Sequence, residues 1–300
     1  MSIEVSKEDR LLLENVCEMH VHLAPDLFLR SLNEIEFAKG AVDVGYRAVL
    51  SKNHFVITAD RAQIVGAEVS CVKFFGGIVL NHTVGGLNPK AVRAAIGFGA
   101  REVWMPTFHA QNHIKVAGQT SYDASRFVPN SDLGPIEGIN ILQEDGEVKQ
   151  EVYEILDLIA ANDLILGSGH ISKEEVFALI KSARKSGVKK ILITHPGFYI
   201  TPWQISDQVR MAEMGAIMEH DVFGCLDKPE RSFTVQHLVE SIRKVGTDKC
   251  VMATDFGQIR NPHPIEGMCQ YIHLMLDNGF TLSEVEKMVK DKPAKLLGID

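Results

Sequence analysis

The chain has 300 residues, of which 45% are hydrophobic and 23% are charged, and its formal net charge is −8. This is the composition of a globular protein with a large core, and an acidic chain without basic stripes argues against nucleic acid or a membrane surface as a partner. No apolar run reaches the ~18 residues that a membrane span requires, and the charged N-terminal stretch lacks the apolar core of a signal peptide. A small-molecule substrate is the expected partner.

Five cysteines are scattered along the chain without a C-x-x-C pair. An odd number at such wide spacing does not suit a disulfide framework, so a reducing, cytoplasmic compartment is expected. Cys17, Cys71 and Cys250 lie in apolar, strand-like runs, and we expect them to be buried as small hydrophobic side chains.

The chain alternates between short apolar runs, polar turns and amphipathic stretches. The apolar runs are nearly continuous rather than alternating with polar residues, which is typical of parallel strands covered on both faces. They predict eight strands, at Val16–His22, Ala48–Ser51, Val72–Val79, Glu102–Pro106, Leu164–Ser168, Ile191–Thr194, Ala216–Glu219 and Cys250–Thr254.

Helical segments are predicted between and after these strands. Two begin at capping boxes, Ser172 with Glu175 and Thr281 with Glu284, and one begins at Pro89, which suits a first helical turn. The predicted helices are Leu32–Val44, Lys90–Gly97, Glu151–Ala161, Glu174–Ser186, Gln204–Met214, Thr234–Lys244, Pro264–Asn278, Thr281–Val289 and Pro293–Leu297.

Eight units of strand and helix predict a (β/α)8 TIM barrel, formed by residues 1–300 as a single domain. A doubly wound open sheet is the structural alternative. An insertion of about residues 107–150 follows the fourth predicted strand, with a small hairpin around Asp145-Gly146. Because it extends the C-terminal face of the barrel, we expect a lid or a pocket wall, with a passive loop as the alternative.

Ligand-type side chains follow the predicted strands at their C-terminal ends. The first strand ends in His20-Val21-His22, and two imidazoles that are two residues apart point to the same face of a strand. Later strand ends carry Lys52, His54, His170, His195, Glu219, His220 and Asp255. Because the ends of parallel barrel strands meet at one rim, we expect these side chains to converge.

Several imidazoles and one carboxylate can hold one or two divalent ions, with Zn2+ expected and Mn2+ or Fe2+ as alternatives. Water in an open coordination position ionises more readily, and a carboxylate can take its proton. Each residue also has an ordinary structural explanation: His170 as a hydrogen-bonded core histidine, His195 as a turn residue before Pro196, and Asp255 as a cap.

This order of residues resembles the amidohydrolase superfamily, and the resemblance spans nearly the whole chain. It is carried by the ligand-type residues at the strand ends and by the C-terminal stretch Thr281–Leu297. The resemblance implies that Asp255 is the general base and acid of a metal-dependent hydrolase. It also implies a set of metal ligands, namely His20, His22, His170, His195 and Asp255.

One element of the superfamily's pattern is missing. Many two-metal members carry a carboxylated lysine or a glutamate at the end of the fourth strand, where this chain has Trp104–His109 without either. Lys52 and His54 stand instead at the end of the second strand. We predict that they bind the substrate or stabilise the transition state. The alternatives are that they join the metal site, that a single ion needs no bridge, or that both are structural.

The sequence leaves the roles of other polar residues open. Only one of Glu219 and His220 can face the pocket, and Glu219 would then orient a ligand imidazole. His109 and His113 lie on the insertion, with the pocket and the surface as alternatives. Arg30 would pair with an anionic substrate group, unless it is solvated. Structural roles are expected for His82, His237, His263 and His273.

These patterns predict a metal-dependent hydrolase that cleaves a C–N, ester or lactone bond of a small polar molecule. A decarboxylase on the same scaffold is a close alternative. The competing functions are a phosphoesterase of the polymerase-and-histidinol-phosphatase type, which also begins with His-x-His, and a non-catalytic ligand-binding barrel. A homo-oligomer remains open, with an apolar face expected at Ile265–Leu276.

Overall fold

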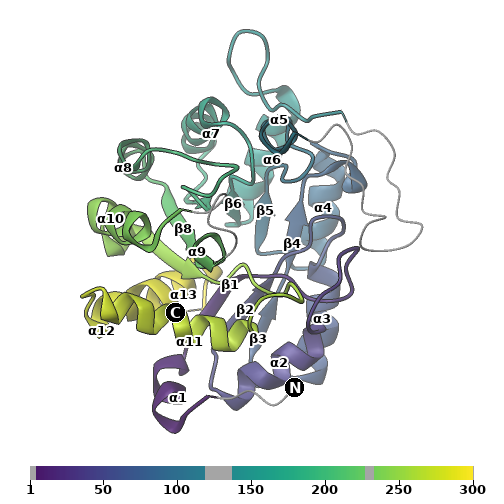
Figure 1. Ribbon diagram of the computed structural model, residues 1–300. Coiled ribbons are helices and arrows are strands. Elements are labelled where there is room, and N and C mark those ends of the chain that lie inside the picture. Colours follow the sequence, from purple (N-terminus) through teal and green to yellow (C-terminus); the bar gives the residue numbers. More distant parts are fainter. Residues whose placement is uncertain (1–4, 119–136, 227–232, 300) are drawn as a thin grey trace.

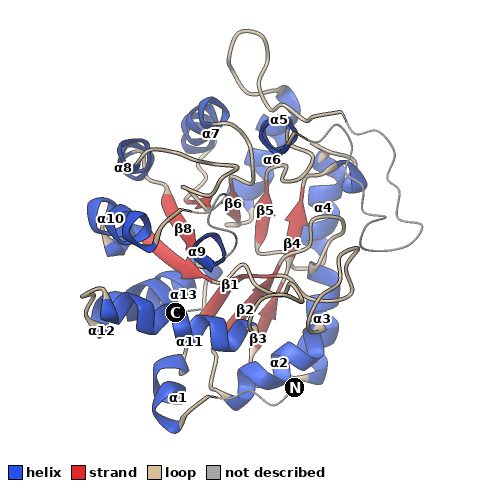
Figure 2. Ribbon diagram, viewed as in Figure 1, coloured by secondary structure: helices blue, strands red, loops and turns tan. Residues whose placement is uncertain are grey.

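The computed structural model describes residues 5–118, 137–226 and 233–299. Its strands lie in the middle of the molecule and its helices surround them (Figure 1). The colouring by secondary structure shows the same layers, with loops that connect each strand to the helices outside (Figure 2). This arrangement covers both faces of the apolar strands, as their sequence requires.

All paired strands in the described ranges are parallel, and neighbours in each sheet follow one another along the chain. The eight predicted strands are confirmed, with small differences in their bounds, since β3 and β4 are two halves of the predicted strand Val72–Val79. One sheet contains β1 (Cys17–Val21), β2 (Ala48–Ser51) and β3 (Lys73–Phe75); the other contains β4 (Gly77–Val79), β5 (Glu102–Trp104), β6 (Ile165–Gly167), β7 (Lys190–Thr194), β8 (Ile217–Asp221) and β9 (Cys250–Ala253).

The two sheets join into the predicted (β/α)8 barrel. At one junction the strand formed by β3 and β4 is interrupted at Gly76, where an added Cβ would lie 2.3 Å from the backbone carbon of Thr58. At the other junction the chain after β9 runs beside β1: Asp255 N–H donates to His20 O and His22 N–H donates to Phe256 O, both at 2.8 Å. The strand order has no reversal of the kind that a doubly wound sheet requires.

Helices follow most strands and pack outside them. The predictions missed α1, α3, α5 and α9, and the predicted helix Thr281–Val289 is α12 followed by a π-helical turn at Lys287–Asp291. The helices are α1 (Lys7–Leu13), α2 (Glu34–Asp43), α3 (Ala59–Glu68), α4 (Pro89–Gly97), α5 (Gln111–Ala117), α6 (Gln150–Ala161), α7 (Lys173–Lys185), α8 (Ile205–Glu213), α9 (Phe223–Leu226), α10 (Val235–Val245), α11 (Pro264–Asp277), α12 (Leu282–Glu286) and α13 (Lys292–Leu297), with 3-10 turns at His82–Val84 and Thr247–Lys249.

Both predicted capping boxes are formed. Ser172 and Glu175 exchange side-chain and backbone hydrogen bonds at the start of α7, and Thr281 and Glu284 do so at the start of α12. Each box satisfies two backbone N–H groups that would otherwise have no partner in the first helical turn. Among the described residues, no helix is long and apolar enough to cross a bilayer.

The C-terminal helix closes one end of the barrel. Met19, Trp104 and Leu192 from the strands share a buried cluster with Leu297 of α13. Arg47, which stands just before β2, donates a hydrogen bond to the backbone oxygen of Ile299. The C-terminal residues therefore lie at the N-terminal ends of the strands, and the opposite end of the barrel carries the ligand-type side chains.

The predicted insertion lies between β5 and β6. It contains α5, and residues 119–136 of the predicted range lie outside the described residues. The predicted hairpin is present, because Leu142 and Val148 form an antiparallel bridge around a turn in which Gly146 has a φ of +83°. Ile141 N–H donates to Oε1 of Glu175 at 2.9 Å, which fixes this hairpin to the start of α7.

Two expectations about apolar surfaces are corrected. Cys71 is exposed because it lies in the turn before β3 rather than in the strand, whereas Cys17 and Cys250 are buried as predicted. The apolar face at Ile265–Leu276, considered for an oligomer, is buried within the chain on the inner side of α11. Neither a homo-oligomer nor a single-domain organisation is tested by this arrangement, so both stay predictions.

Gly257 lies at the junction between β9 and β1 and is expected to tolerate no side chain. Its φ is +125°, and an added Cβ would lie 1.6 Å from the carbonyl oxygen of His22. We expect Gly257→Ala to lower the free energy of unfolding by at least ~2 kcal/mol, because both backbone strain and overpacking oppose the new methyl group. Urea unfolding followed by circular dichroism measures this change.

Gly66→Ala is the matched control, since Gly66 lies in α3 and nothing stands within 4 Å of its Cβ position. Alanine favours a helix over glycine, so this variant should gain up to ~1 kcal/mol. Equal stabilities of the two variants would contradict the importance of the junction.

Candidate functional site

The residues predicted as metal ligands meet at the C-terminal ends of the strands. All five are buried: His20, His22, His170, His195 and Asp255. Asp255 Oδ1 lies 3.3 Å from His20 Nε2 and 3.0 Å from His22 Nε2. The ring of His195 lies against that of His20, with centroids 5.4 Å apart, and His170 lies 5.1 Å from His195. The barrel therefore brings together side chains from both ends of the chain.

Two of these imidazoles are held by carboxylates of β8. His20 Nδ1 lies 2.9 Å from Glu219 Oε1, and His195 Nδ1 lies 2.8 Å from Asp221 Oδ2. Glu219 and Asp221 are two residues apart in one strand, so both project from the same face. These partners assign the tautomer: each neutral imidazole donates Nδ1–H and keeps its lone pair on Nε2, which is the form that binds a metal ion.

His170 is held in a similar way by another histidine. Its Nδ1 lies 2.7 Å from Nδ1 of His113, and the two rings stack with centroids 4.9 Å apart. Its Nε2 lies 3.0 Å from Nε2 of His195. Two lone pairs repel each other at this distance unless a proton or a cation lies between them, so the two Nε2 atoms are suited to share an ion.

At the C-terminal ends of the strands, two sets of three ligand-type residues have donor atoms close enough to hold an ion. One set is His20, His22 and Asp255, and the other is His20, His195 and Asp221; the atoms of each set lie within 4.8 Å of one another. In the second set, Asp221 Oδ2 approaches the Nδ1 atoms of both histidines, at 3.7 Å for His20 and 2.8 Å for His195. The first set is favoured because it uses the Nε2 atoms that remain.

The predicted ligands form one buried centre together with Glu219, Asp221 and Lys52, and the charge of this centre also fits a metal ion. Its three carboxylates, Glu219, Asp221 and Asp255, all interact electrostatically with the amine of Lys52. Glu219 Oε2 and Asp221 Oδ1 are buried and have no hydrogen-bond partner. Buried carboxylates without compensating charge are unstable by several kcal/mol each. A divalent cation would offset this cost, so the donor set and the charge both suit one.

Burial lowers the pKa of the histidines in the centre. It lowers the pKa of His195 to about 4 and that of His22 below its ordinary value, and it holds the pKa values of His20 and His170 well below that value. The nearby charge of Lys52 acts in the same direction. The imidazoles are therefore neutral near pH 7 and available as metal ligands.

The carboxylates of the centre are of two kinds. Burial raises the pKa of Glu219 and that of Asp221 well above the ordinary range, and neighbouring carboxylates add to the effect. Burial acts in the same direction on Asp255, but the hydrogen bond with His22 and the charges around it lower the pKa of that carboxyl overall. Asp255 is thus the carboxylate of the three that is most easily kept ionised, as a general base must be.

Lys52 stands at the end of β2 and reaches the ligand group. Its Nζ lies 3.1 Å from His20 Nε2 and 5.3 Å from the centroid of the Trp104 ring, and the side chain is fully buried. Burial lowers the pKa of this amine, while the carboxylates of the centre oppose the shift. The amine thus lies where it can contact an ion or a substrate atom that binds next to His20 Nε2.

His54 flanks the centre on another side. Its ring stacks on that of His22, with centroids 4.6 Å apart, and its Nδ1 lies 2.9 Å from Thr107 Oγ1. Thr107 Oγ1 also accepts a hydrogen bond from Asn81 at 2.7 Å, so the threonine hydroxyl has its own proton to donate to His54. This network fixes the orientation of the ring.

Two of the predicted ligands have strained backbones. His195 has a φ of +33° and Asp255 a φ of +54°, in a region that residues with side chains seldom adopt. Each stands where the chain leaves its strand, β7 or β9. Such strain is unfavourable by about 1–3 kcal/mol per residue and is characteristic of functional sites. Here it accompanies two side chains that face the centre.

Of the four polar residues whose roles the sequence left open, two contact the predicted ligands, namely Glu219 and His113. Glu219 contacts His20, and His220 projects from the opposite face of β8 because side chains alternate along a strand. His113 is buried against His170, whereas His109 accepts a hydrogen bond from the backbone of His82.

Asp221 is the residue of the centre that sequence reasoning missed. It stands two residues after Glu219, which is the same spacing as in the His20-x-His22 pair. That spacing was a usable signal, because side chains two residues apart in a strand share a face. The predicted strand ended at Glu219, whereas β8 continues to Asp221.

An aromatic cluster adjoins the centre. The rings of Phe28, Phe55 and Phe108 have centroid distances of 5.6–6.4 Å to one another, and Phe108 lies 4.3 Å from His54. The guanidinium of Arg30 lies 5.3 Å from the centre of the Phe28 ring. Planar apolar surface and a cation thus lie on the same side of the metal ligands.

Arg30 is anchored in this position by an acid. Its Nε and one terminal nitrogen both lie 2.7 Å from Asp26 Oδ2, and its side chain is 3% exposed. The positive charge of Arg30 contributes to lowering the pKa values of His22 and His54. The guanidinium is therefore close enough to the centre to act on its electrostatics.

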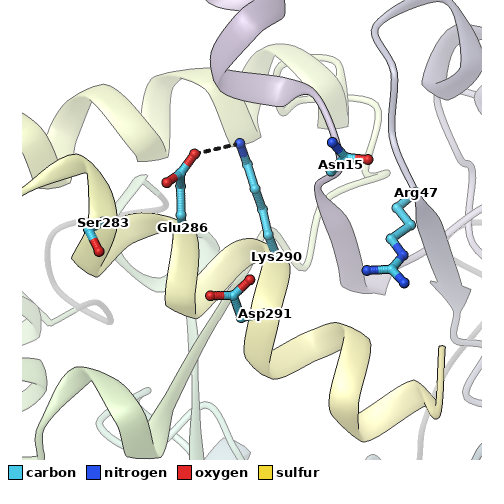
Figure 3. A pocket seen from close by; sticks show the side chains of 6 residues that line it. All are labelled: Asn15, Arg47, Ser283, Glu286, Lys290 and Asp291. Atoms are coloured by element: carbon cyan, nitrogen blue, oxygen red, sulfur yellow. Dashed lines mark hydrogen bonds and ion pairs between the residues drawn. The ribbon is translucent and has the colours of Figure 1, made fainter. Parts of the chain in front are cut away.

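A separate pocket lies at the opposite end of the barrel. It has a volume of about 440 Å³, and its lining residues are Asn15, Arg47, Ser283, Glu286, Lys290 and Asp291 (Figure 3). Lys290 is paired with Glu286 there at 3.0 Å. Because Arg47 precedes β2, this pocket lies at the N-terminal ends of the strands, the end of a TIM barrel that serves stability rather than catalysis.

Comparison with known proteins identifies a family and a fold. A family model described as "Family of unknown function (DUF6282)" matches residues 15–219. No curated protein sequence matches the chain. The matched region contains four of the five predicted ligands, all except Asp255.

Solved structures with a similar fold cover nearly the whole chain. An amidohydrolase from Pseudomonas aeruginosa has a TM-score of 0.64 at 12% identity, over 96% of this chain and 98% of that one. The phosphotriesterase homology protein from Escherichia coli has a TM-score of 0.55 at 11% identity, over 95% and 99%. A 2,6-dihydroxybenzoate decarboxylase, bound to 2,6-dihydroxybenzoate, has a TM-score of 0.59 at 11% identity, over 95% and 99%. At identities of 11–12%, these structures show that the chain shares their fold.

Glu219→Gln preserves the shape of the side chain and removes the charge that holds the Nδ1 proton of His20. We expect the affinity for Zn2+ to fall about 10–100-fold, which is the usual effect of losing the hydrogen-bond partner of a metal-bound histidine. Titration of metal-free protein with zinc, in competition with a chromophoric chelator, measures the affinity.

Glu102→Gln is the matched control. Glu102 is as deeply buried as Glu219, and its carboxylate has no hydrogen-bond partner among the described residues. Its zinc affinity should stay at the wild-type level. Equal losses in both variants would mean that the total charge inside the barrel, rather than the hydrogen bond to His20, sets the affinity.

Proposed function

The chain belongs to a family of unknown function (DUF6282) and has an amidohydrolase fold, and on that basis we propose that it is a metal-dependent hydrolase. It cleaves a C–N, ester or lactone bond of a small polar molecule. The ligands of the metal are His20, His22, His170, His195 and Asp255. Zn2+ suits these nitrogen and oxygen donors, and Mn2+ or Fe2+ are the alternatives.

One observation carries this proposal. Three histidines each have Nδ1 engaged, by Glu219, by Asp221 or by His113, so Nε2 is the atom that each can offer to an ion. Nε2 of His20 also lies 3.1 Å from Lys52 Nζ, which an ion bound there would displace. A purely structural histidine would be satisfied by one such hydrogen bond and solvent. Repeating the same arrangement at the ends of three strands is the organisation of a metal centre, where outer hydrogen bonds fix the ligand imidazoles.

The residues of the centre divide the chemical work. A divalent ion bound there would act as a Lewis acid toward water and the substrate carbonyl. Asp255 takes the proton from the attacking water and returns it to the leaving group, since its pKa is lowered and it adjoins two ligand imidazoles. Lys52 and His54 bind the substrate and donate hydrogen bonds to the oxygen that becomes negative.

The same geometry suggests the kind of substrate. Arg30 supplies a fixed cation next to the aromatic cluster of Phe28, Phe55 and Phe108. We propose that a carboxylate of the substrate pairs with Arg30 while a planar or apolar part rests against the rings. The decarboxylase with a similar fold is bound to 2,6-dihydroxybenzoate, which is a planar carboxylate of this kind.

Decarboxylation is the second candidate function. It is favoured by the similarity to that decarboxylase, whose TM-score is 0.59 over 95% of this chain. The two functions differ in their products, because hydrolysis consumes water and yields an acid whereas decarboxylation releases carbon dioxide. Product analysis on one planar carboxylate substrate separates them.

Asp255→Asn tests the proposed base. Asparagine tolerates a φ of +54° as well as aspartate does, so the variant should fold normally. We expect kcat to fall about 10²–10⁴-fold, because a positioned base contributes this much. The measurement is turnover by zinc-loaded protein of the best substrate from a panel of lactones, esters, amides and phosphoesters.

Asp163→Asn is the control for this variant, since Asp163 has a similar φ of +52° and lies away from the centre, paired with Lys190. It should retain full activity. Wild-type turnover in Asp255→Asn would overturn the role of that residue, and a best substrate among the phosphoesters would favour the competing phosphoesterase function.

Arg30→Gln tests the proposed carboxylate site. We expect kcat/KM for a carboxylated substrate to fall about 10–100-fold, since a hydrogen bond to a charged group contributes ~1.5–3 kcal/mol, with most of the loss in KM. Arg101→Gln is the matched control, because Arg101 lies 5.1 Å over the Phe75 ring at the other end of the barrel. Equal kinetics of wild type and Arg30→Gln would exclude this site.

A further inference from the structure

A second group of potential metal ligands lies on the outside of the barrel, between α1 and α11. Cys269 and His273 are four residues apart in α11, so they project from the same face of the helix. Asp9 of α1 lies against this face, with its Oδ1 2.6 Å from His273 Nε2. The three donor atoms lie within 4.8 Å of one another.

The group lines a cavity that has room for an ion and its water. The cavity has a volume of about 560 Å³, and further carboxylates border it, with Asp277 one helical turn beyond His273. Cys269 is 8% exposed, while His273 and Asp9 are more open to solvent. The full lining is Val5, Asp9, Glu266, Cys269, Gln270, His273, Leu274 and Asp277.

The types of donor select the metal. A thiolate, an imidazole and a carboxylate together suit Zn2+, whereas Mg2+ and Ca2+ require oxygen ligands. Burial raises the pKa of the Cys269 thiol to about 11, so the ion must displace its proton. Binding of one Zn2+ therefore releases this proton to solvent and leaves a thiolate on the metal.

We propose that Asp9, Cys269 and His273 form a second, structural zinc site, with water or a bordering carboxylate as the remaining ligand. The ion links α1 to α11 and so fastens the N-terminal helix to the barrel. The site is separate from the centre at the strand ends and does not depend on the proposed catalytic function.

Cobalt substitution tests this site with a specific signal. Thiolate bound to Co2+ gives a near-ultraviolet charge-transfer band, and the proposed ligands of the catalytic centre include no sulfur. We expect the full chain loaded with Co2+ to show this band and Cys269→Ser to abolish it. Cys71→Ser is the matched control, since Cys71 is exposed and should leave the band unchanged.

His273→Ala provides a variant that should fold in any case, because its side chain is 49% exposed. We expect it to weaken Co2+ binding at the band at least tenfold. Absence of the band in wild-type protein at saturating Co2+, or its persistence in Cys269→Ser, would overturn the proposal. Retention of the band in Asp255→Asn shows that the two sites are distinct, so that failure of one proposal leaves the other intact.

Discussion

The hydrogen bonds on the Nδ1 atoms of the buried histidines are the interaction on which the centre depends. Without them, each imidazole could rotate or change tautomer, and its Nε2 lone pair would have no fixed direction. Glu219 and Asp221 hold His20 and His195 from one strand, so a single element orients two ligands. The rigidity of β8, which is buried between two parallel neighbours, is passed directly to the metal ligands.

The closing junction of the barrel fixes the other half of the centre. Asp255 N–H donates to His20 O, so the backbone hydrogen bond that joins the end of β9 to β1 also sets the distance between their side chains. Gly257 makes this approach possible because its position against His22 leaves no room for a side chain. The hydrogen bond that closes the barrel therefore also positions two residues of the centre, so the geometry of the centre depends on the stability of the fold.

The charge inside the barrel sets what the centre can bind. Buried carboxylates outnumber the nearby cation Lys52, and the histidines are neutral because burial lowers their pKa values. Such a site is suited to a divalent cation. Arg30 and the aromatic cluster lie beside the ligand group, where the substrate proposed above would contact them. The cluster between α1 and α11 is different, since its thiol and exposed histidine suit a structural ion.

The sequence by itself determined the order of the elements and most of the residues that meet at the strand ends. Continuous apolar runs identified the strands, and capping boxes identified α7 and α12, because both signals are local. Helix α3 escaped prediction because it lacks a side-chain cap and contains Gly66, so packing against β3 rather than its own sequence stabilises it.

Only the tertiary structure decided which polar groups touch. The His20-x-His22 spacing predicted a shared face, but it could not show that Asp221 holds His195 or that His113 holds His170, since those partners lie on other elements. The same holds for Lys52, whose approach to His20 depends on how β1 and β2 are aligned. Local sequence specifies to which face of its strand a side chain projects. The distances between side chains on different strands follow from the register and closure of the whole barrel.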